Sequence, residues 1–226
     1  FPVIIDNMMN LELLFEATRL SSDSIYHNIA VKHANTTMKN HFREDNSSYH
    51  VVVYDTITGD VKDKVTHQGY NGESAWARGQ AWGIYGFTMC YRYTKDPAYL
   101  NQAKTSAEFY LNNPNLPEDG IPFWDFNDPE IPNSPRDVSA ATVVASALLE
   151  LSEYAQNPEY NAYSNKVLRT LESEEYVLAT TIDAPFILDH STGNWPKKDE
   201  MDVPIVYGDY YYLEALLRTK KQKTEY

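Results

Sequence analysis

One short pattern occurs three times in the chain, and it limits the possible folds more than any other feature. An Asp or Asn is followed by a residue suited to a first helical turn, and a Tyr stands three positions after the Asp or Asn. The three instances begin at Asp23, Asp96 and Asn157. An Asp or Asn side chain accepts hydrogen bonds from the free N–H groups of a helix start, and a proline directly after it costs no hydrogen bond. Because each instance closely follows another helical pattern, each predicts the turn of a helical hairpin.

Apolar residues recur at helical spacing through most of the chain, which predicts about seven helices. The stripes are Ile4, Met8, Leu11 and Phe15; Ile25, Ile29 and His33; Tyr99, Ala103, Ala107 and Tyr110; Val138, Ala141, Ala145, Leu148 and Leu149; and Tyr211, Ala215 and Leu216. Repeated helical hairpins of this size predict an all-α protein, either an α/α toroid or an α-solenoid.

Three segments interrupt the helices. Tyr49–Thr66 combines β-branched and aromatic residues with a Thr-Gly-Asp turn, which predicts a short β-hairpin inserted between helices. Asn112–Arg136 is rich in proline, and Thr181–Gly208 contains both glycine and proline, so both segments are expected to be long loops.

The composition excludes several classes of protein. The 226 residues suffice to bury a real core, and a formal charge of −13 disfavours a protein that coats nucleic acid. The single cysteine, Cys90, excludes an internal disulfide framework, and no apolar run approaches the roughly 18 residues of a membrane-spanning helix. The 18 tyrosines are unusual. Aromatic rings can line a saccharide site, although most such side chains simply fill a core.

The start of the chain suggests that these residues belong to a longer protein. Phe1 is not a methionine, and no charged leader precedes the apolar residues Phe1–Ile5, which predict the start of a helix. A closed toroid of six hairpins has twelve helices, more than the number predicted here. We therefore expect residues 1–226 to be the C-terminal part of one toroid domain whose upstream helices are missing.

Asp6 is the first candidate for catalysis. It stands in the apolar sequence Val3-Ile4-Ile5-Asp6-Asn7-Met8-Met9. Burial there would raise the pKa of the carboxyl group toward the range useful for proton transfer. Capping of a helix N-terminus is the commoner use of such an Asp, and this alternative stays open.

A second group of candidates lies between His67 and Gly83, where two Trp, one Arg and two Gln gather. A helix that begins near Ser74 would present Trp76, Arg78 and Trp82 at its N-terminal end, which favours a carboxylate ligand. Two glycines four residues apart would allow a neighbouring segment to approach closely. A packing seam between helices is the alternative, but it explains the Arg, Gln and Gly residues less well.

Other residues have simpler interpretations. His50 lies near aromatic residues, where a histidine is more often structural, and Asp137 suits the N-cap of a helix. The sequence has no histidine pair of metal-site spacing, cysteine cluster, phosphate-binding glycine loop or serine nucleophile elbow. We therefore predict no metal and no cofactor.

Taken in order, these segments resemble the unsaturated glucuronyl hydrolases of glycoside hydrolase family 88. The resemblance extends over nearly the whole chain. It rests on Ile4–Leu11, Thr66–Gly69, Trp76–Gly83, Pro135–Asp137 with Ser139–Ala141, and Tyr207–Leu216.

The resemblance implies an α/α toroid and an unusual hydrolysis. Enzymes of this family hydrate the C4=C5 double bond of the unsaturated uronic acid that polysaccharide lyases leave at the non-reducing end of glycosaminoglycan oligosaccharides. One Asp protonates C4 and helps water to add at C5, after which the hemiketal opens and the glycosidic bond breaks. Position by position, the resemblance makes Asp6 that general acid and base. The same match implies substrate-binding roles for His50, Gln68, Trp76, Arg78 and Trp82, by contact with the sugar or by holding the shape of the site.

Two departures from the family pattern follow from the same resemblance. A second essential acidic residue of the family lies upstream of Phe1, and closure of the toroid also requires the missing helices. We therefore expect the 226-residue chain alone to have little or no activity. The sister family acting on unsaturated rhamnogalacturonan fragments is an alternative, as is a helical-repeat carbohydrate-binding protein without activity. Gln80 favours the glucuronyl branch. We expect no nucleic-acid or membrane partner, and the family suggests a bacterial periplasmic location, with a cytoplasmic one as the alternative.

Overall fold

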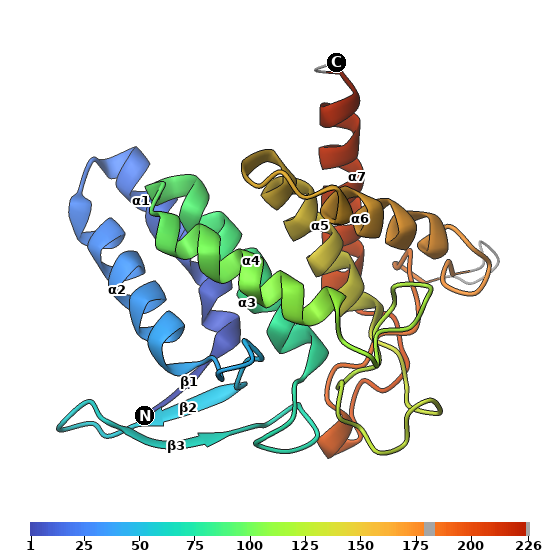
Figure 1. Cartoon of the computed structure of the whole chain (residues 1–226), viewed down its shortest axis with the longest axis horizontal. Helices are drawn as coiled ribbons and strands as arrows, with labels where there is room; N and C mark the ends of the chain where they lie inside the picture. Colours follow the sequence, from blue (N-terminus) through green and yellow to red (C-terminus); the bar gives the residue numbers. More distant parts are fainter. Residues whose placement is uncertain (179–183, 225–226) are drawn as a thin grey trace.

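The computed structural model describes residues 1–178 and 184–224, and it confirms a mostly helical fold. Its described residues contain seven α-helices, as the periodicity predicts, and most of them pair into hairpins (Figure 1). The helices are α1 (Leu11–Ser21), α2 (Ser24–Asn40), α3 (Ala77–Thr94), α4 (Pro97–Leu111), α5 (Val138–Tyr154), α6 (Pro158–Leu171) and α7 (Val206–Thr224). Two 3₁₀-helices, η1 (Ile5–Asn10) and η2 (Trp195–Lys197), complete the set.

The three recurring patterns start helices as predicted. The side chains of Asp23, Asp96 and Asn157 accept hydrogen bonds from the backbone N–H groups two positions later, at 2.9, 2.9 and 3.0 Å. They begin α2, α4 and α6, so the three hairpins are α1/α2, α3/α4 and α5/α6. Each short turn therefore takes its shape from one capping side chain.

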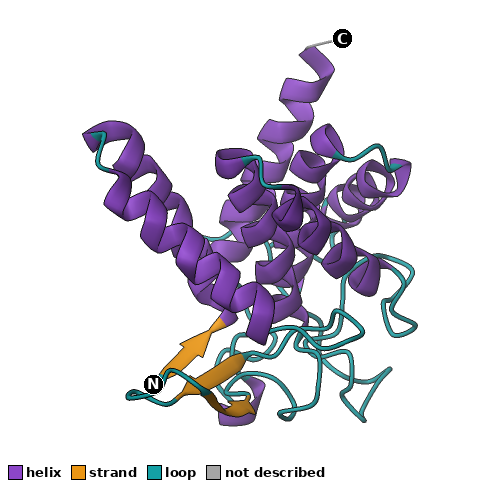
Figure 2. Ribbon diagram, turned by 60° about the vertical axis from the view of Figure 1, so that its left-hand side comes forward, coloured by secondary structure: helices purple, strands orange, loops and turns teal. Residues whose placement is uncertain are grey.

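The helices form two rows. α1, α3, α5 and α7 lie side by side, while α2, α4 and α6 each pack outside their hairpin partner. The short turns lie at one end of the helices, and the strands and long loops lie at the other end, which we call the loop end (Figure 2). The inner helices therefore all begin at the loop end. This arrangement is that of an α/α toroid.

The buried face of α2 differs from the predicted stripe. Ala30, Ala34 and Thr37 are its buried residues, whereas Ile25 and Ile29 are 53% and 50% exposed. The spacing thus predicted the helix correctly but not the buried face, because small residues allow α2 to lie close against its neighbours.

The predicted β-hairpin is present but belongs to a larger sheet. Strands β2 (Val51–Tyr54) and β3 (Val61–Val65) pair in antiparallel fashion, and β1 (Pro2–Ile4) adds to the other side of β2. The predicted helix start at Phe1–Ile5 was therefore wrong. Pro2 has no N–H to donate and suits an edge strand, and Val3 pairs with Val52 across the sheet.

The two long loops are also present. Asn112–Arg136 has no helix or strand, although Asp125 of this loop forms an isolated β-bridge with Trp76. Of the second predicted loop, Thr181–Asp183 lie outside the described residues, and the remainder contains only η2 before α7 begins at Val206. Among the described helices, none combines the length and apolar character that a bilayer crossing requires.

Candidate active site

Asp6 lies in η1, at the loop end of the inner helices. It does not cap that helix, because Ile4 occupies the N-cap position and no side chain caps it. The Asp6 side chain is 26% exposed, but its Oδ2 atom is buried and has no hydrogen-bond partner among the described residues. Burial raises the pKa of Asp6 above its ordinary value of 3.8, against the opposing effects of its backbone hydrogen bond and of Arg78 and Trp82. The carboxyl group is therefore suited to hold a proton and donate it.

His50 faces this carboxyl group from the end of the segment that precedes β2. Its Nε2 atom is 3.7 Å from Asp6 Oδ2, and its ring lies against Trp76 with the centroids 4.5 Å apart. Burial lowers the pKa of His50 to about 3, helped by His67 and Arg78. His50 is therefore a neutral imidazole at physiological pH.

Arg78 lies in the first turn of α3 and is buried. Its Nη1 donates to Asp137 Oδ2 at 2.5 Å and to the Thr192 carbonyl at 2.7 Å, and its Nη2 donates to the Gly193 carbonyl at 2.7 Å. The guanidinium thus ties α3 to the start of α5 and to the loop before α7. In this arrangement Arg78 maintains the shape of the site.

Gln68 and the two tryptophans complete the predicted set. Gln68 Nε2 donates to the same Gly193 carbonyl at 2.8 Å. The Trp76 ring lies 4.6 Å from the guanidinium carbon of Arg78, and Trp82 is close enough to Asp6 to affect its pKa. The indole N–H group of Trp76 is buried without a partner among the described residues, whereas that of Trp82 is directed to the Asp6 carboxyl group and lowers its pKa. A buried donor without a partner suits a bound polar molecule such as a sugar.

All six predicted site residues therefore lie together, although they come from four segments. Their individual roles toward a substrate remain predictions. The helix behind them begins at Ala77, three residues later than expected, because Trp76 is extended and Ala77 N–H bonds to the Trp124 carbonyl. Gly79 permits this start, since a Cβ there would lie 2.8 Å from Trp76 Cε3.

Gln80 is not part of this cluster. Its amide is buried, accepts from the backbone N–H of Ser48 at 2.8 Å, and donates to the carbonyls of Asn46 and Ser106. The residue ties α3 to its neighbours and carries no free group toward Asp6.

The sequence reasoning missed two contributors. Tyr207, in the first turn of α7, lies against Trp82 and places its ring 5.4 Å from the Arg78 guanidinium carbon. Burial raises its pKa to about 12, with contributions from Asp137 and Asp6. Its position in the matched segment Tyr207–Leu216 was the available signal. No sequence signal could have marked the carbonyls of Thr192 and Gly193, because every residue has a backbone carbonyl group.

Asp137 has two functions at once. It accepts from the backbone N–H of Ala140, 3.3 Å away, as the N-cap of α5, which confirms the structural interpretation. It also pairs with Arg78. The part of the chain that the structure describes contains no group of three or more His, Cys, Asp or Glu residues arranged to hold a metal.

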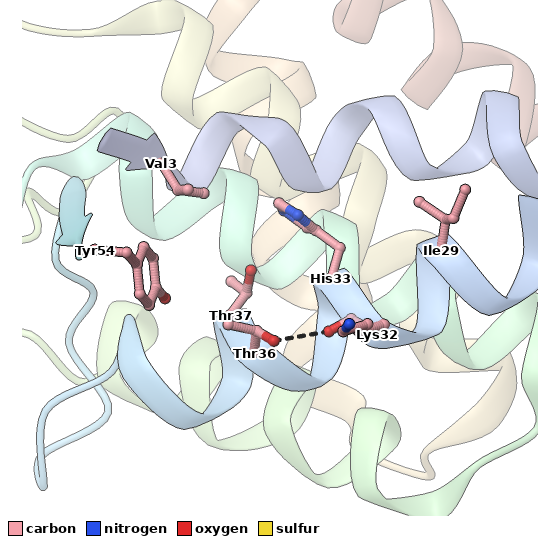
Figure 3. Close-up of a pocket in the computed structure, with 7 residues that line it drawn as sticks. All are labelled: Val3, Ile29, Lys32, His33, Thr36, Thr37 and Tyr54. Atoms are coloured by element: carbon pink, nitrogen blue, oxygen red, sulfur yellow. Dashed lines mark hydrogen bonds between the residues drawn. The ribbon is translucent and has the colours of Figure 1, made fainter. Parts of the chain in front are cut away.

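A separate cavity of about 260 Å³ lies between α2 and the sheet (Figure 3). Its lining residues are Val3, Ile29, Lys32, His33, Thr36, Thr37 and Tyr54. None of the predicted site residues contributes to it, so it is distinct from the Asp6 site.

Comparison with known proteins identifies the family. No family model matches the chain. An unsaturated glucuronyl hydrolase of Formosa agariphila is 65% identical over 218 residues, which cover 96% of this chain and 54% of that protein. The crystal structure of an unsaturated glucuronyl hydrolase specific for heparin superimposes with a TM-score of 0.97 at 50% identity, covering 99% of this chain and 61% of the other.

A third similar protein was solved with a sugar. It is a mutant of the unsaturated glucuronyl hydrolase from Streptococcus agalactiae complexed with dGlcA-GalNAc6S, at a TM-score of 0.84 and 36% identity, covering 97% of this chain and 56% of the other. The chain thus spans little more than half the length of the proteins it matches. By sequence and by structure, the chain belongs to the unsaturated glucuronyl hydrolase family.

Proposed function

We propose that the protein removes the unsaturated uronic acid from the non-reducing end of glycosaminoglycan oligosaccharides. The observation that supports this most directly is the Asp6 carboxyl group, buried at Oδ2, with a raised pKa and aromatic neighbours. A carboxyl group whose pKa is raised by burial holds its proton to higher pH than an exposed one and can act as a general acid. The 65% identity to an unsaturated glucuronyl hydrolase supports the same reaction.

The reaction consumes one water molecule and needs one proton donor. Asp6 gives its proton to C4 of the C4=C5 double bond, and water adds at C5 as the carboxylate takes up a proton from it. The product is a hemiketal at C5. Its ring opens to a ketone, and the hemiacetal left at C1 releases the remaining sugar as an alcohol.

Aromatic rings suit the substrate. The rings of Trp76 and Tyr207 lie against the Arg78 guanidinium, whose charge is balanced by Asp137, and Trp82 lies against Tyr207. The charge of −13 on the whole chain has little effect on a short anionic sugar, because physiological salt largely screens exposed charges more than about 8 Å away.

The substrate class follows from the relatives. Similar proteins are described as specific for heparin or as complexed with dGlcA-GalNAc6S, and both descriptions belong to unsaturated glucuronyl hydrolases. This agreement favours glycosaminoglycan fragments over rhamnogalacturonan fragments. It also favours an enzyme over a binding scaffold.

The test is loss of the ultraviolet absorbance of the C4=C5 bond, measured with the full-length protein. Unsaturated chondroitin, hyaluronan and heparin disaccharides serve as substrates, and we expect at least one to lose absorbance. Loss only with an unsaturated rhamnogalacturonan disaccharide would move the protein to the sister family. Binding without any loss would favour a carbohydrate-binding protein.

A variant tests the assignment of Asp6. We expect Asp6→Asn in the full-length protein to abolish turnover, because the amide cannot donate the required proton, while calorimetry still detects disaccharide binding. Continued hydration by this variant would refute the assignment.

A further inference from the structure

The contacts of His50 determine which of its nitrogens carries the proton. Its Nδ1 atom accepts from the backbone N–H groups of His67 and Gln68, each at 3.2 Å. A nitrogen that accepts hydrogen bonds is unprotonated, so the proton of the neutral ring is on Nε2. Because backbone N–H groups cannot change their role, the segment after β3 fixes this tautomer.

The protonated nitrogen faces Asp6. The Nε2 atom is 3.7 Å from Asp6 Oδ2, and that oxygen has no partner among the described residues. A shift of less than about 1 Å would bring the two atoms to hydrogen-bond distance, and catalytic hydrogen bonds often tighten only when substrate binds. The Trp76 ring, tilted by 35° to the imidazole with the centroids 4.5 Å apart, restricts movement of His50.

We propose that His50 is a positioning residue for Asp6: its Nε2–H donates to Oδ2 and so places the transferable proton of Asp6 on Oδ1. The proposal rests on the proposed function and gives His50 a part in the chemistry rather than in sugar contact. A carboxylic acid whose one oxygen accepts a hydrogen bond carries its proton on the other oxygen.

Groups from several elements surround the ring. Arg78 approaches from α3, His67 from the loop after β3, and His41 from the end of α2. All three disfavour a second proton on His50. Asp6, on η1, is the acidic group at Nε2. The ring therefore stays a neutral donor while Asp6 changes its charge.

Two substitutions separate the proposed role from simple packing. In His50→Asn the amide oxygen can take the place of Nδ1 and keep the two backbone contacts, but no donor reaches Asp6. In His50→Gln the amide N–H group can occupy the place of Nε2. We expect His50→Asn to lower kcat roughly a hundredfold with little change in KM. We expect His50→Gln to recover at least a tenth of the native kcat.

The pH profile gives a second readout. A hydrogen bond to the carboxylate stabilises its charged form, so its loss raises the pKa of Asp6. The alkaline limb of the activity profile should therefore shift to higher pH in His50→Asn and remain near the native position in His50→Gln. If both variants lose the same fraction of kcat and the alkaline limb of the activity profile does not shift, His50 has only a packing role. An increase in KM alone would indicate sugar contact instead.

Nitrogen-15 NMR of histidine-labelled protein tests the tautomer without any activity. The His50 signal, assigned by its absence in His50→Asn, should show the neutral Nε2–H form unchanged between pH 5 and pH 8. An Nδ1–H form, or titration within this range, would overturn the proposal even if the native protein hydrates its substrate. Absence of hydration with the expected NMR signal would instead refute only the proposed function.

Discussion

Arg78 and Asp137 form a buried ion pair in which Nη1 lies 2.5 Å from Oδ2. Both side chains are almost fully enclosed, and each has further partners: the guanidinium bonds to two loop carbonyls, and Asp137 caps α5. The pair thus joins two inner helices and the loop before α7 at one point, close enough to Asp6 for Arg78 to affect its pKa. The shape of the site depends on this junction.

Replacement of Arg78 tests that dependence. Arg78→Met should lower the free energy of unfolding by about 3–5 kcal/mol, because it leaves the buried charge of Asp137 without its partner. Urea unfolding followed by circular dichroism measures the change. Arg19→Met is the matched control, since Arg19 pairs with Glu16 at 2.7 Å on the surface, where such pairs contribute about 1 kcal/mol or less. Equal losses in the two variants would contradict the central role of the buried pair.

Asp6 should reduce stability at neutral pH. Its pKa is higher in the folded protein than in the unfolded chain, so the folded state binds more protons between the two values, and stability falls as pH rises through this window. Asp6→Asn should therefore be more stable than the native protein at pH 7, and this advantage should disappear near pH 3.5.

Asp55 provides a control of opposite sign. Hydrogen bonds from the backbone of Thr58 and Ile57, and from Lys62, hold its pKa below the ordinary value. Its contribution to stability is present above the unfolded pKa and is lost as pH falls, so Asp55→Asn should destabilise at pH 7 and not in acid. Denaturant midpoints across pH measure both variants. The same sign for both would refute the interpretation of Asp6.

The helix cap of α4 can be tested by itself. Asp96→Ala should cost about 1 kcal/mol, because the Ala98 N–H group loses its acceptor, whereas Asp96→Asn should cost much less. Thermal unfolding of the two variants distinguishes loss of the cap from loss of the charge. If Asp96→Asn is as unstable as Asp96→Ala, the negative charge rather than the cap matters.

Gly86 controls how closely η1 approaches α3. A Cβ there would lie 2.5 Å from Met8 Cβ, so Gly86→Ala should displace η1 and cost about 1–3 kcal/mol. Since Asp6 is in η1, turnover by the full-length protein should also fall. Gly83→Ala is the milder control, because its Cβ would contact only the Phe42 ring at 3.2 Å. Full turnover in a folded Gly86→Ala variant would show that the position of Asp6 tolerates this displacement.

Local chemistry could be predicted from the sequence alone. The caps at Asp23, Asp96 and Asn157, the helical stripes and the turn around Gly59 all involve groups only a few residues apart. Such interactions depend little on the rest of the fold, so spacing and residue type suffice to predict them. The apolar setting of Asp6 and the cluster between His67 and Gly83 belong to the same class, and the resemblance to a family added His50 and the individual roles of the site residues.

Tertiary structure alone decided what depends on distant partners. Pro2–Ile4 became a strand because it pairs with Val51–Val53, about fifty residues away, and α2 buries its small residues because of what lies beside it. Arg78 and Gln68 meet on the Gly193 carbonyl, more than a hundred residues later. A backbone carbonyl has no residue type by which a sequence could mark it, and the partner of a buried side chain is set only when the chain folds.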